Sequence, residues 1–66
     1  MLTYYRGHVI VLLVDTVLTA EITELATGTP LPTKVTATLP EGADVCITRA
    51  KMLVDIYLKA PGSLER

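Results

Sequence analysis

The stretch that decides the fold is GHVIVLLVDTVLTA, residues Gly7–Ala20. Its centre, Val9–Val14, is an uninterrupted apolar run in which most residues are β-branched. A membrane-spanning helix needs about 20 apolar residues, and Asp15 ends this run much earlier, so a buried β-strand is the better interpretation. A strand that is apolar on both sides needs cover on both faces of its sheet.

A second β-rich run, Val17–Leu25, follows directly, and Asp15 and Thr16 are the residues that can turn the chain between the two runs. A two-residue loop predicts an antiparallel hairpin in which Leu13 pairs with Leu18. Because side chains alternate along a strand, this register places one wholly apolar set on the core face, namely Val9, Val11, Leu13, Leu18, Ala20 and Ile22. The outer face then carries Ile10, Leu12, Val14 and Val17.

The next segment indicates a loop and a third strand. Residues 26–32, ATGTPLP, contain the turn-forming residues glycine and proline. Thr33–Leu39 alternates polar and apolar residues, as a half-buried strand does, and Pro40–Gly42 ends it. The residues before the first strand, Met1–Arg6, are expected to form a short lead-in whose tyrosines begin that strand.

From Ala43 to about Lys59 the apolar residues recur at helical spacing, which predicts an amphipathic helix. Ala60–Gly62, with its proline and glycine, is the expected stop. The expected start is weaker, because neither Gly42 nor Asp44 comes with a capping box.

These elements predict an α+β fold: a three-stranded antiparallel β-meander followed by one C-terminal α-helix packed on one face, in the order β-β-β-α. The alternative replaces the helix with strands at residues 45–49 and 53–58, which would close a small five-stranded β-barrel. One small domain is expected over residues 1–66, with its core at about residues 4–60 and a frayed tail at residues 61–66.

Composition restricts the class of protein. Six basic and seven acidic side chains give a net charge of −1, whereas proteins that bind nucleic-acid backbones usually carry a basic excess. No signal peptide or membrane segment is recognised at the start of the chain. The single cysteine excludes an intramolecular disulfide and favours a reducing compartment, so a cytoplasmic protein is expected.

Few residues are candidates for chemistry. His8 and Cys46 are the only residues of their kinds, and one of each lacks the spacing of a zinc site. Cys46 lies on the apolar side of the predicted helix, where a free cysteine behaves as a small hydrophobic residue. The acidic residues are spread over turns and solvated faces, without the pairing that acid–base catalysis needs. We therefore predict no catalytic residue, no cofactor and no metal, and a protein that is not an enzyme.

One aromatic and basic cluster, Tyr4, Tyr5, Arg6 and His8, is the sort of combination that stacks on bases and contacts phosphates. The competing interpretation is that the tyrosines cover the core and Arg6 is solvated. The cluster is retained as a weak candidate for ligand contact.

Half of the residues are hydrophobic, and the mean hydropathy of +0.45 is high for a small monomer. Two apolar groups lie outside the predicted core, one on the outer face of the sheet and one on the far side of the helix. A homodimer would cover them. The predicted dimer interface is therefore Ile10, Leu12, Val14, Val17, Val45, Met52 and Ile56.

The predicted order of elements resembles the small antitoxin domains of the HicB type over about 50 residues, in fold shape alone. Those domains carry a Pro-Asp-x-Pro-Gly-Cys stretch and a Gly-Asp-Thr-x-Glu-Glu-Ala helix start, where this chain has Ala26–Pro32 and Leu39–Asp44. The predicted function is a non-enzymatic, homodimeric interaction module. The alternative is an antitoxin-like regulator that binds a protein or nucleic-acid partner.

Overall fold

The computed structural model describes the backbone of residues 1–64 and the side chains of residues 1–59. Strands come first and a single long helix follows. In chain order the elements are β1 (Leu2–Tyr5), β2 (His8–Val14), β3 (Leu18–Glu24), β4 (Thr29–Pro30), β5 (Val35–Ala37) and α1 (Ala43–Leu64). This order confirms the predicted α+β class, with additional short strands.

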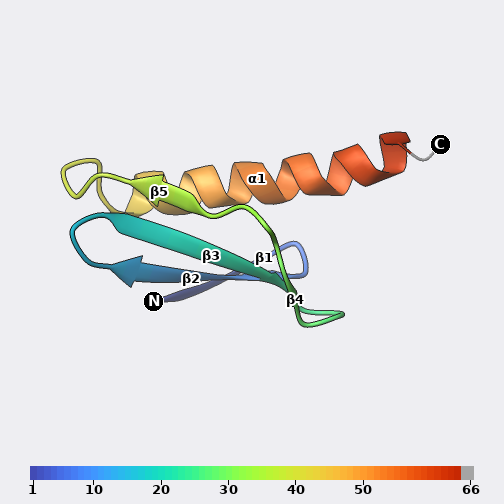
Figure 1. Cartoon of the computed structure of the whole chain (residues 1–66), viewed down its shortest axis with the longest axis horizontal. Helices are drawn as coiled ribbons and strands as arrows, with labels where there is room; N and C mark the ends of the chain where they lie inside the picture. Colours follow the sequence, from blue (N-terminus) through green and yellow to red (C-terminus); the bar gives the residue numbers. More distant parts are fainter. Residues whose placement is uncertain (65–66) are drawn as a thin grey trace.

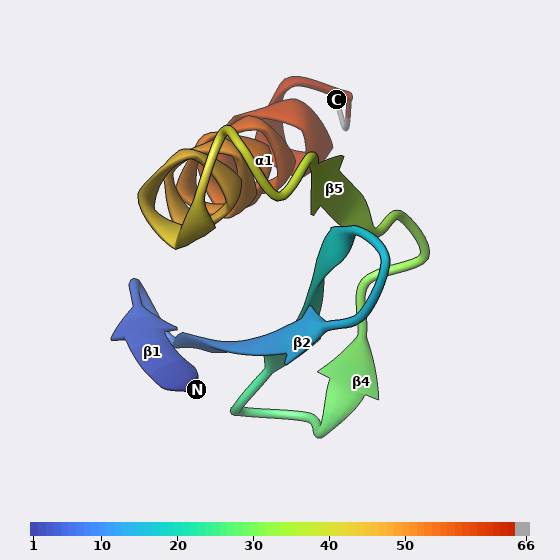
Figure 2. The same cartoon turned by 90° about the vertical axis from the view of Figure 1, so that its left-hand side faces the viewer.

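The strands form one antiparallel sheet in the order β1-β2-β3-β4, and β5 pairs with β3 beside β4. Helix α1 crosses one face of this sheet and extends beyond its end (Figure 1). The view along the helix shows that, among the described residues, no helix or strand packs on the opposite face of the sheet (Figure 2). The sheet stays open, so the alternative of a closed barrel is wrong.

The structure has a strand, β1, where the sequence predicted only a short lead-in before the apolar strand β2. Strand β1 pairs with β2, and Tyr5 lies opposite His8, so only Arg6 and Gly7 connect them. Both have positive φ angles, 48° and 77°, which suits a two-residue hairpin turn whose second position favours glycine. Strand β2 is therefore paired on both sides and is not an edge of the sheet.

The second hairpin has a loop one residue longer than predicted, which shifts the pairing of β2 with β3 by one residue. Leu12 lies opposite Ala20 and Val14 opposite Leu18, so three residues, Asp15–Val17, form the loop. A two-residue type I′ turn needs a positive φ at both positions, which the β-branched Thr16 adopts poorly, and of the described non-glycine residues only Arg6 has a positive φ. Because side chains alternate along a strand, this shift exchanges the two faces of β2.

The core lies between the sheet and the inner side of α1. Strand β2 contributes Ile10 and Leu12, 0% and 6% exposed, where the predicted register had Val9, Val11 and Leu13. The predicted core residues of β3 are confirmed. The complete buried apolar set is Ile10, Leu12, Leu18, Ala20, Ile22, Ala37, Cys46, Ile47, Ala50 and Val54.

Two further corrections concern the third predicted strand and the loop before it. Within residues 26–32 the short strand β4 pairs with the end of β3, placing Pro30 opposite Thr23. The strand expected over Thr33–Leu39 is regular only at Val35–Ala37, and Leu39 is 49% exposed. The chain leaves the sheet after Ala37 because the next residues turn into the helix.

The helix continues through Pro61 and Gly62 to Leu64, so the predicted stop is wrong. Proline removes one amide donor and crowds the preceding turn, but it does not force the backbone out of helical angles. Of the predicted frayed tail, residues 61–66, the backbone of residues 61–64 belongs to α1, and positions 65 and 66 lie outside the described residues. Within the described residues, α1 lacks the length of apolar sequence that crossing a membrane requires.

Candidate functional site

The face of the sheet opposite α1 carries an apolar surface formed by β1 and β2. Since side chains alternate, the residues of β2 that point away from the core are those between the buried ones. Cross-strand pairing joins them to β1, with Leu2 opposite Val11 and Tyr4 opposite Val9. We call this surface the outer sheet face and define it by Leu2, Tyr4, Val9, Val11 and Leu13.

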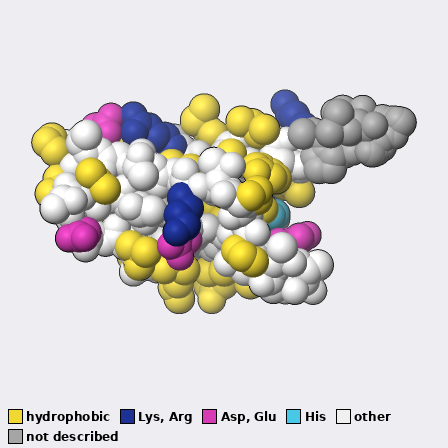
Figure 3. Space-filling model, viewed as in Figure 1, with side chains coloured by type: hydrophobic (Ala, Val, Ile, Leu, Met, Phe, Trp, Pro, Cys, Tyr) yellow, Lys and Arg dark blue, Asp and Glu magenta, His cyan; other side chains and the backbone are white. Residues whose placement is uncertain are grey.

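Three members of the outer sheet face are well exposed: Tyr4 at 67%, Leu2 at 59% and Leu13 at 45%. Val9 and Val11, in the middle strand, are half-buried by their neighbours. Hydrophobic side chains gather along the lower side of the molecule, beneath the sheet (Figure 3). A contiguous apolar surface of this kind marks an interaction site more often than isolated exposed residues do.

Strand β3 borders the outer sheet face with polar residues. Thr19, Glu21 and Thr23 lie opposite Leu13, Val11 and Val9. The Glu21 carboxylate pairs with the Lys34 ammonium at 2.9 Å. The border therefore carries one charge of each sign beside the apolar surface.

The structure divides the predicted dimer interface into three groups. Ile10 and Leu12 are buried beneath α1, so their expected place on an outer face is wrong, because the hairpin register moves them to the core. Val14, at the end of β2, is 68% exposed, and Val17, in the second hairpin loop, is 42% exposed.

The third group lies on the outer side of α1. Met52 and Ile56 are 58% and 57% exposed there, and Val45 is half-buried. Val45 and Met52 also line a shallow groove of ≈ 350 Å³ along the helix, together with Asp44, Thr48 and Arg49. The sequence placed all three residues outside the core; Met52 and Ile56 are exposed, whereas Val45 packs against the core cluster.

The predicted aromatic and basic cluster does not form one surface. Tyr4 belongs to the outer sheet face, whereas Tyr5 and Arg6 turn toward α1 and bind Asp55. The Tyr5 hydroxyl donates to Asp55 Oδ1 at 2.9 Å, and Arg6 Nη1 donates to the same oxygen at 2.7 Å. Lys51 Nζ lies 5.5 Å from the centre of the Tyr5 ring, within cation–π range.

These contacts tie the tip of the first hairpin to the middle of the helix. Arg6 and, after it, Tyr5 hold the pKa of the Asp55 carboxyl below its usual value by donating to the carboxylate. The same hydrogen bond raises the pKa of the Tyr5 hydroxyl. The Arg6 guanidinium is thus already paired with a carboxylate, which leaves little positive charge for a phosphate.

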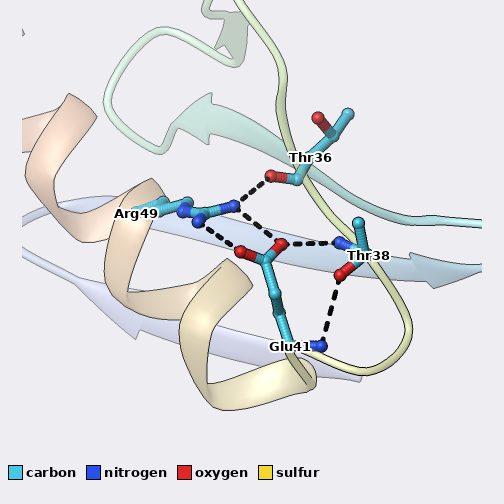
Figure 4. A network of polar contacts seen from close by, with 4 residues as sticks. All are labelled: Thr36, Thr38, Glu41 and Arg49. Atoms are coloured by element: carbon cyan, nitrogen blue, oxygen red, sulfur yellow. Dashed lines mark hydrogen bonds and ion pairs between the residues drawn. The ribbon is translucent and has the colours of Figure 1, made fainter.

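A second network fixes the start of α1 (Figure 4). Thr38 N donates to Glu41 Oε1 at 2.8 Å and Glu41 N donates to Thr38 Oγ1 at 3.3 Å, the reciprocal pattern of a capping box. Arg49 Nη2 donates to Glu41 Oε2 at 2.7 Å, and Arg49 Nη1 donates to the Thr36 carbonyl at 3.1 Å. Together with Thr38, Arg49 lowers the pKa of Glu41 to about 2.

Sequence reasoning missed this capping box because it examined Gly42 and Asp44. The signal is the pattern Thr38-x-x-Glu41, which lies before the first residue of the helix. Gly42 still accepts the first helical hydrogen bond, from Cys46 N at 3.3 Å. The network is a structural anchor, since its polar groups satisfy one another.

The two remaining candidates, His8 and Cys46, lie in different places. Cys46 is fully buried against β5, as expected, and burial raises the pKa of its thiol. His8 is 4% exposed and lies at the end of the sheet beneath the later turns of α1. Among the described residues, no group of three histidine, cysteine or acidic side chains could hold a metal ion.

His8 lines a depression of ≈ 280 Å³ together with Glu24, Leu31, Tyr57 and Leu58. Its Nδ1 lies 2.9 Å from the Arg6 carbonyl oxygen and donates to it. The depression was not predicted, because its walls come from β2, β3, the loop after β4 and the helix.

Comparison of the chain with protein-family models, curated proteins and solved structures finds no match.

Proposed function

We propose that this protein is a non-enzymatic interaction module that assembles as a homodimer through the outer sheet face. The observation that carries the proposal is the contiguous apolar surface of Leu2, Tyr4, Val9, Val11 and Leu13, on the side of the sheet without a helix. A two-fold axis places the same surface of two copies against each other, so both apolar faces are covered at once.

Three properties support a second copy as the occupant. The apolar surface extends over two adjacent strands, so packing of two sheets face to face would bury it in one step. The border carries both Glu21 and Lys34, so two copies meet without an excess of like charge. A chain of 66 residues by itself buries only about 60% of the surface that its unfolded chain exposes, and it gains stability from assembly.

The outer side of α1 is the competing interface. Its apolar residues, Val45, Met52 and Ile56, form a narrow stripe next to Arg49, which is held by Glu41. The outer sheet face is broader and has its charged residues at the border, so we favour it. Val14 lies on the helix side of β2, together with Ile10 and Leu12, so it is not part of the outer sheet face.

The alternative function, a regulator that binds a different protein or a nucleic acid, has less support. Arg6 is paired with Asp55, and Tyr4 points away from Tyr5, so the cluster of residues 4–8 presents no joint surface. We also propose a cytoplasmic location, because the one cysteine, Cys46, is unpaired and buried.

Sedimentation equilibrium at micromolar concentrations tests the homodimer, using the wild type and Val11→Lys. The new lysine lies opposite Glu21, so the monomer can accommodate its charge, whereas a dimer would bury it. Losing one buried valine side chain from each copy costs about 1.5 kcal/mol per site. The dimer contains two such sites, so the total of about 3 kcal/mol predicts a dissociation constant about 100-fold higher.

Two controls locate the interface. Thr36→Lys adds the same charge to the polar part of the same side of the sheet, opposite Thr19, and should leave the dissociation constant nearly unchanged. Met52→Lys adds it to the outer side of α1 and should also have little effect. A wild type that is monomeric at these concentrations would contradict the homodimer, and a larger effect of Met52→Lys than of Val11→Lys would move the interface to the helix.

A further inference from the structure

The depression at the end of the sheet is built around a buried histidine whose second ring nitrogen is free. Nδ1 of His8 donates its hydrogen to the Arg6 carbonyl, so the neutral ring carries its lone pair on Nε2. Nε2 has no hydrogen-bond partner among the described residues. Every fully buried side-chain nitrogen or oxygen atom of the described residues has a hydrogen-bond partner. Because Nε2 has none, it is not fully buried and is accessible from the depression.

Glu24 lies on the neighbouring strand β3, on the same side of the sheet as His8. His8 and Glu24 are opposite each other in the β2–β3 ladder, so their side chains share one face at a Cβ separation of about 5 Å. Both residues line the depression. The Glu24 carboxylate accepts one hydrogen bond, from Thr27 Oγ1 at 3.2 Å, which leaves further lone pairs available.

The other walls supply apolar surface and one hydroxyl. Leu31 comes from the loop after β4, and Leu58 and Tyr57 come from α1. The Tyr57 hydroxyl lies 3.4 Å from Thr33 Oγ1, a long contact that leaves it available to a ligand. The site therefore combines two hydrogen-bond acceptors, one of them negatively charged, with aliphatic walls.

We propose that this depression binds a small primary ammonium ion that carries a short aliphatic chain. An ammonium group has three donors and a positive charge, which complement His8 Nε2 and the Glu24 carboxylate. The aliphatic chain packs against Leu31 and Leu58. The volume of ≈ 280 Å³ suits a ligand of a few heavy atoms, for which millimolar affinity is expected. The inference does not depend on the homodimer, since the depression lies on the helix side of the sheet.

NMR titration of the His8 imidazole tests the proposal, because the chain has one histidine and its ring signals need no further assignment. The probe is n-butylammonium chloride, with sodium butyrate and n-butanol as matched compounds. We expect saturable shifts of the His8 ring signals with n-butylammonium and much smaller ones with the other two. An equal response to n-butanol, or the absence of saturation with n-butylammonium, would overturn the proposal.

Two variants locate the ammonium group. Glu24→Gln keeps the oxygen that accepts from Thr27 but removes the charge, and should weaken n-butylammonium binding about tenfold. Glu21→Gln is the matched control, because Glu21 lies three residues earlier in β3 on the other face, and it should bind as the wild type does. If both variants weakened n-butylammonium binding equally, the effect would be a general one of charge, and the assignment of the ammonium site to Glu24 would be overturned.

Leu31→Ala provides a test that keeps both polar groups. It should weaken n-butylammonium binding several-fold while leaving methylammonium binding unchanged, because the smaller ion does not reach the aliphatic wall. Equal loss for both ions would contradict the assignment of the apolar wall. Far-UV circular dichroism of each variant establishes that the fold is retained.

Discussion

Leu12 and Leu13 are adjacent residues of the same type that the structure places on opposite faces of β2. Leu12 is 6% exposed in the core, and Leu13 is 45% exposed on the outer sheet face. Replacing leucine with alanine removes three carbon groups, worth about 0.8 kcal/mol each when buried, or about 2.4 kcal/mol. The cavity left in the core adds to this, so Leu12→Ala should cost about 3–5 kcal/mol.

Leu13→Ala leaves no enclosed cavity and loses about half of the transfer energy, so it should cost about 1.3 kcal/mol. A domain of 66 residues is stable by about 3–10 kcal/mol, so the difference between the two variants is large. Urea denaturation followed by circular dichroism measures both free energies of unfolding.

Protein concentration distinguishes the two roles further. The cost of Leu13→Ala should grow with protein concentration if a second copy covers the outer sheet face, whereas that of Leu12→Ala should change little. An equal cost for both variants, or a greater cost for Leu13→Ala at low concentration, would refute the register of β2 against β3.

Two other predictions concern side chains with shifted pKa values. Cys46 is fully buried and burial raises the pKa of its thiol, so a thiol reagent should label the native protein far more slowly than the urea-unfolded chain; comparable rates would contradict its burial. Glu41 has its pKa lowered from 4.5 to about 2, mainly by Arg49, so its contribution to stability is present above pH 4.5 and is lost as the pH falls toward 2. Glu41→Gln should therefore be less stable than the wild type at pH 6, and the difference should shrink on acidification in urea denaturation series; a difference independent of pH would exclude this linkage.

The sequence by itself determined the α+β class, the strands β2, β3 and β5, the helix α1, and the order of these elements. An apolar β-branched run predicted a strand, clean alternation predicted the third strand, and helical spacing from Ala43 predicted α1. The buried helix residue Cys46 and the buried β3 residues Leu18, Ala20 and Ile22 followed from the same patterns. These features depend on local periodicity, which each segment carries within itself.

The sequence also contained signals for the first hairpin and for the capping box. The first is Arg6-Gly7 between the strand residues Tyr4-Tyr5 and His8-Val9, and the second is Thr38-x-x-Glu41. Both are short signals: Arg6 was assigned to a lead-in before the first predicted strand, and the helix cap was sought at Gly42 and Asp44 instead of at Thr38. Recognising the Arg6-Gly7 turn would have placed β2 in the middle of the sheet.

Only the tertiary structure decided which side of β2 faces the core. Every residue from Val9 to Val14 is apolar, so the pattern of β2 itself does not distinguish Ile10 and Leu12 from Val9 and Val11. The choice was made by the three-residue loop, which sets the register against β3, and by α1, which covers one face of the sheet. The His8 depression has the same origin, because residues distant in the chain meet there when the helix crosses the sheet. A one-residue shift inverts every side chain of a strand, so a face can be assigned only when the partner strand and the covering helix are both in place.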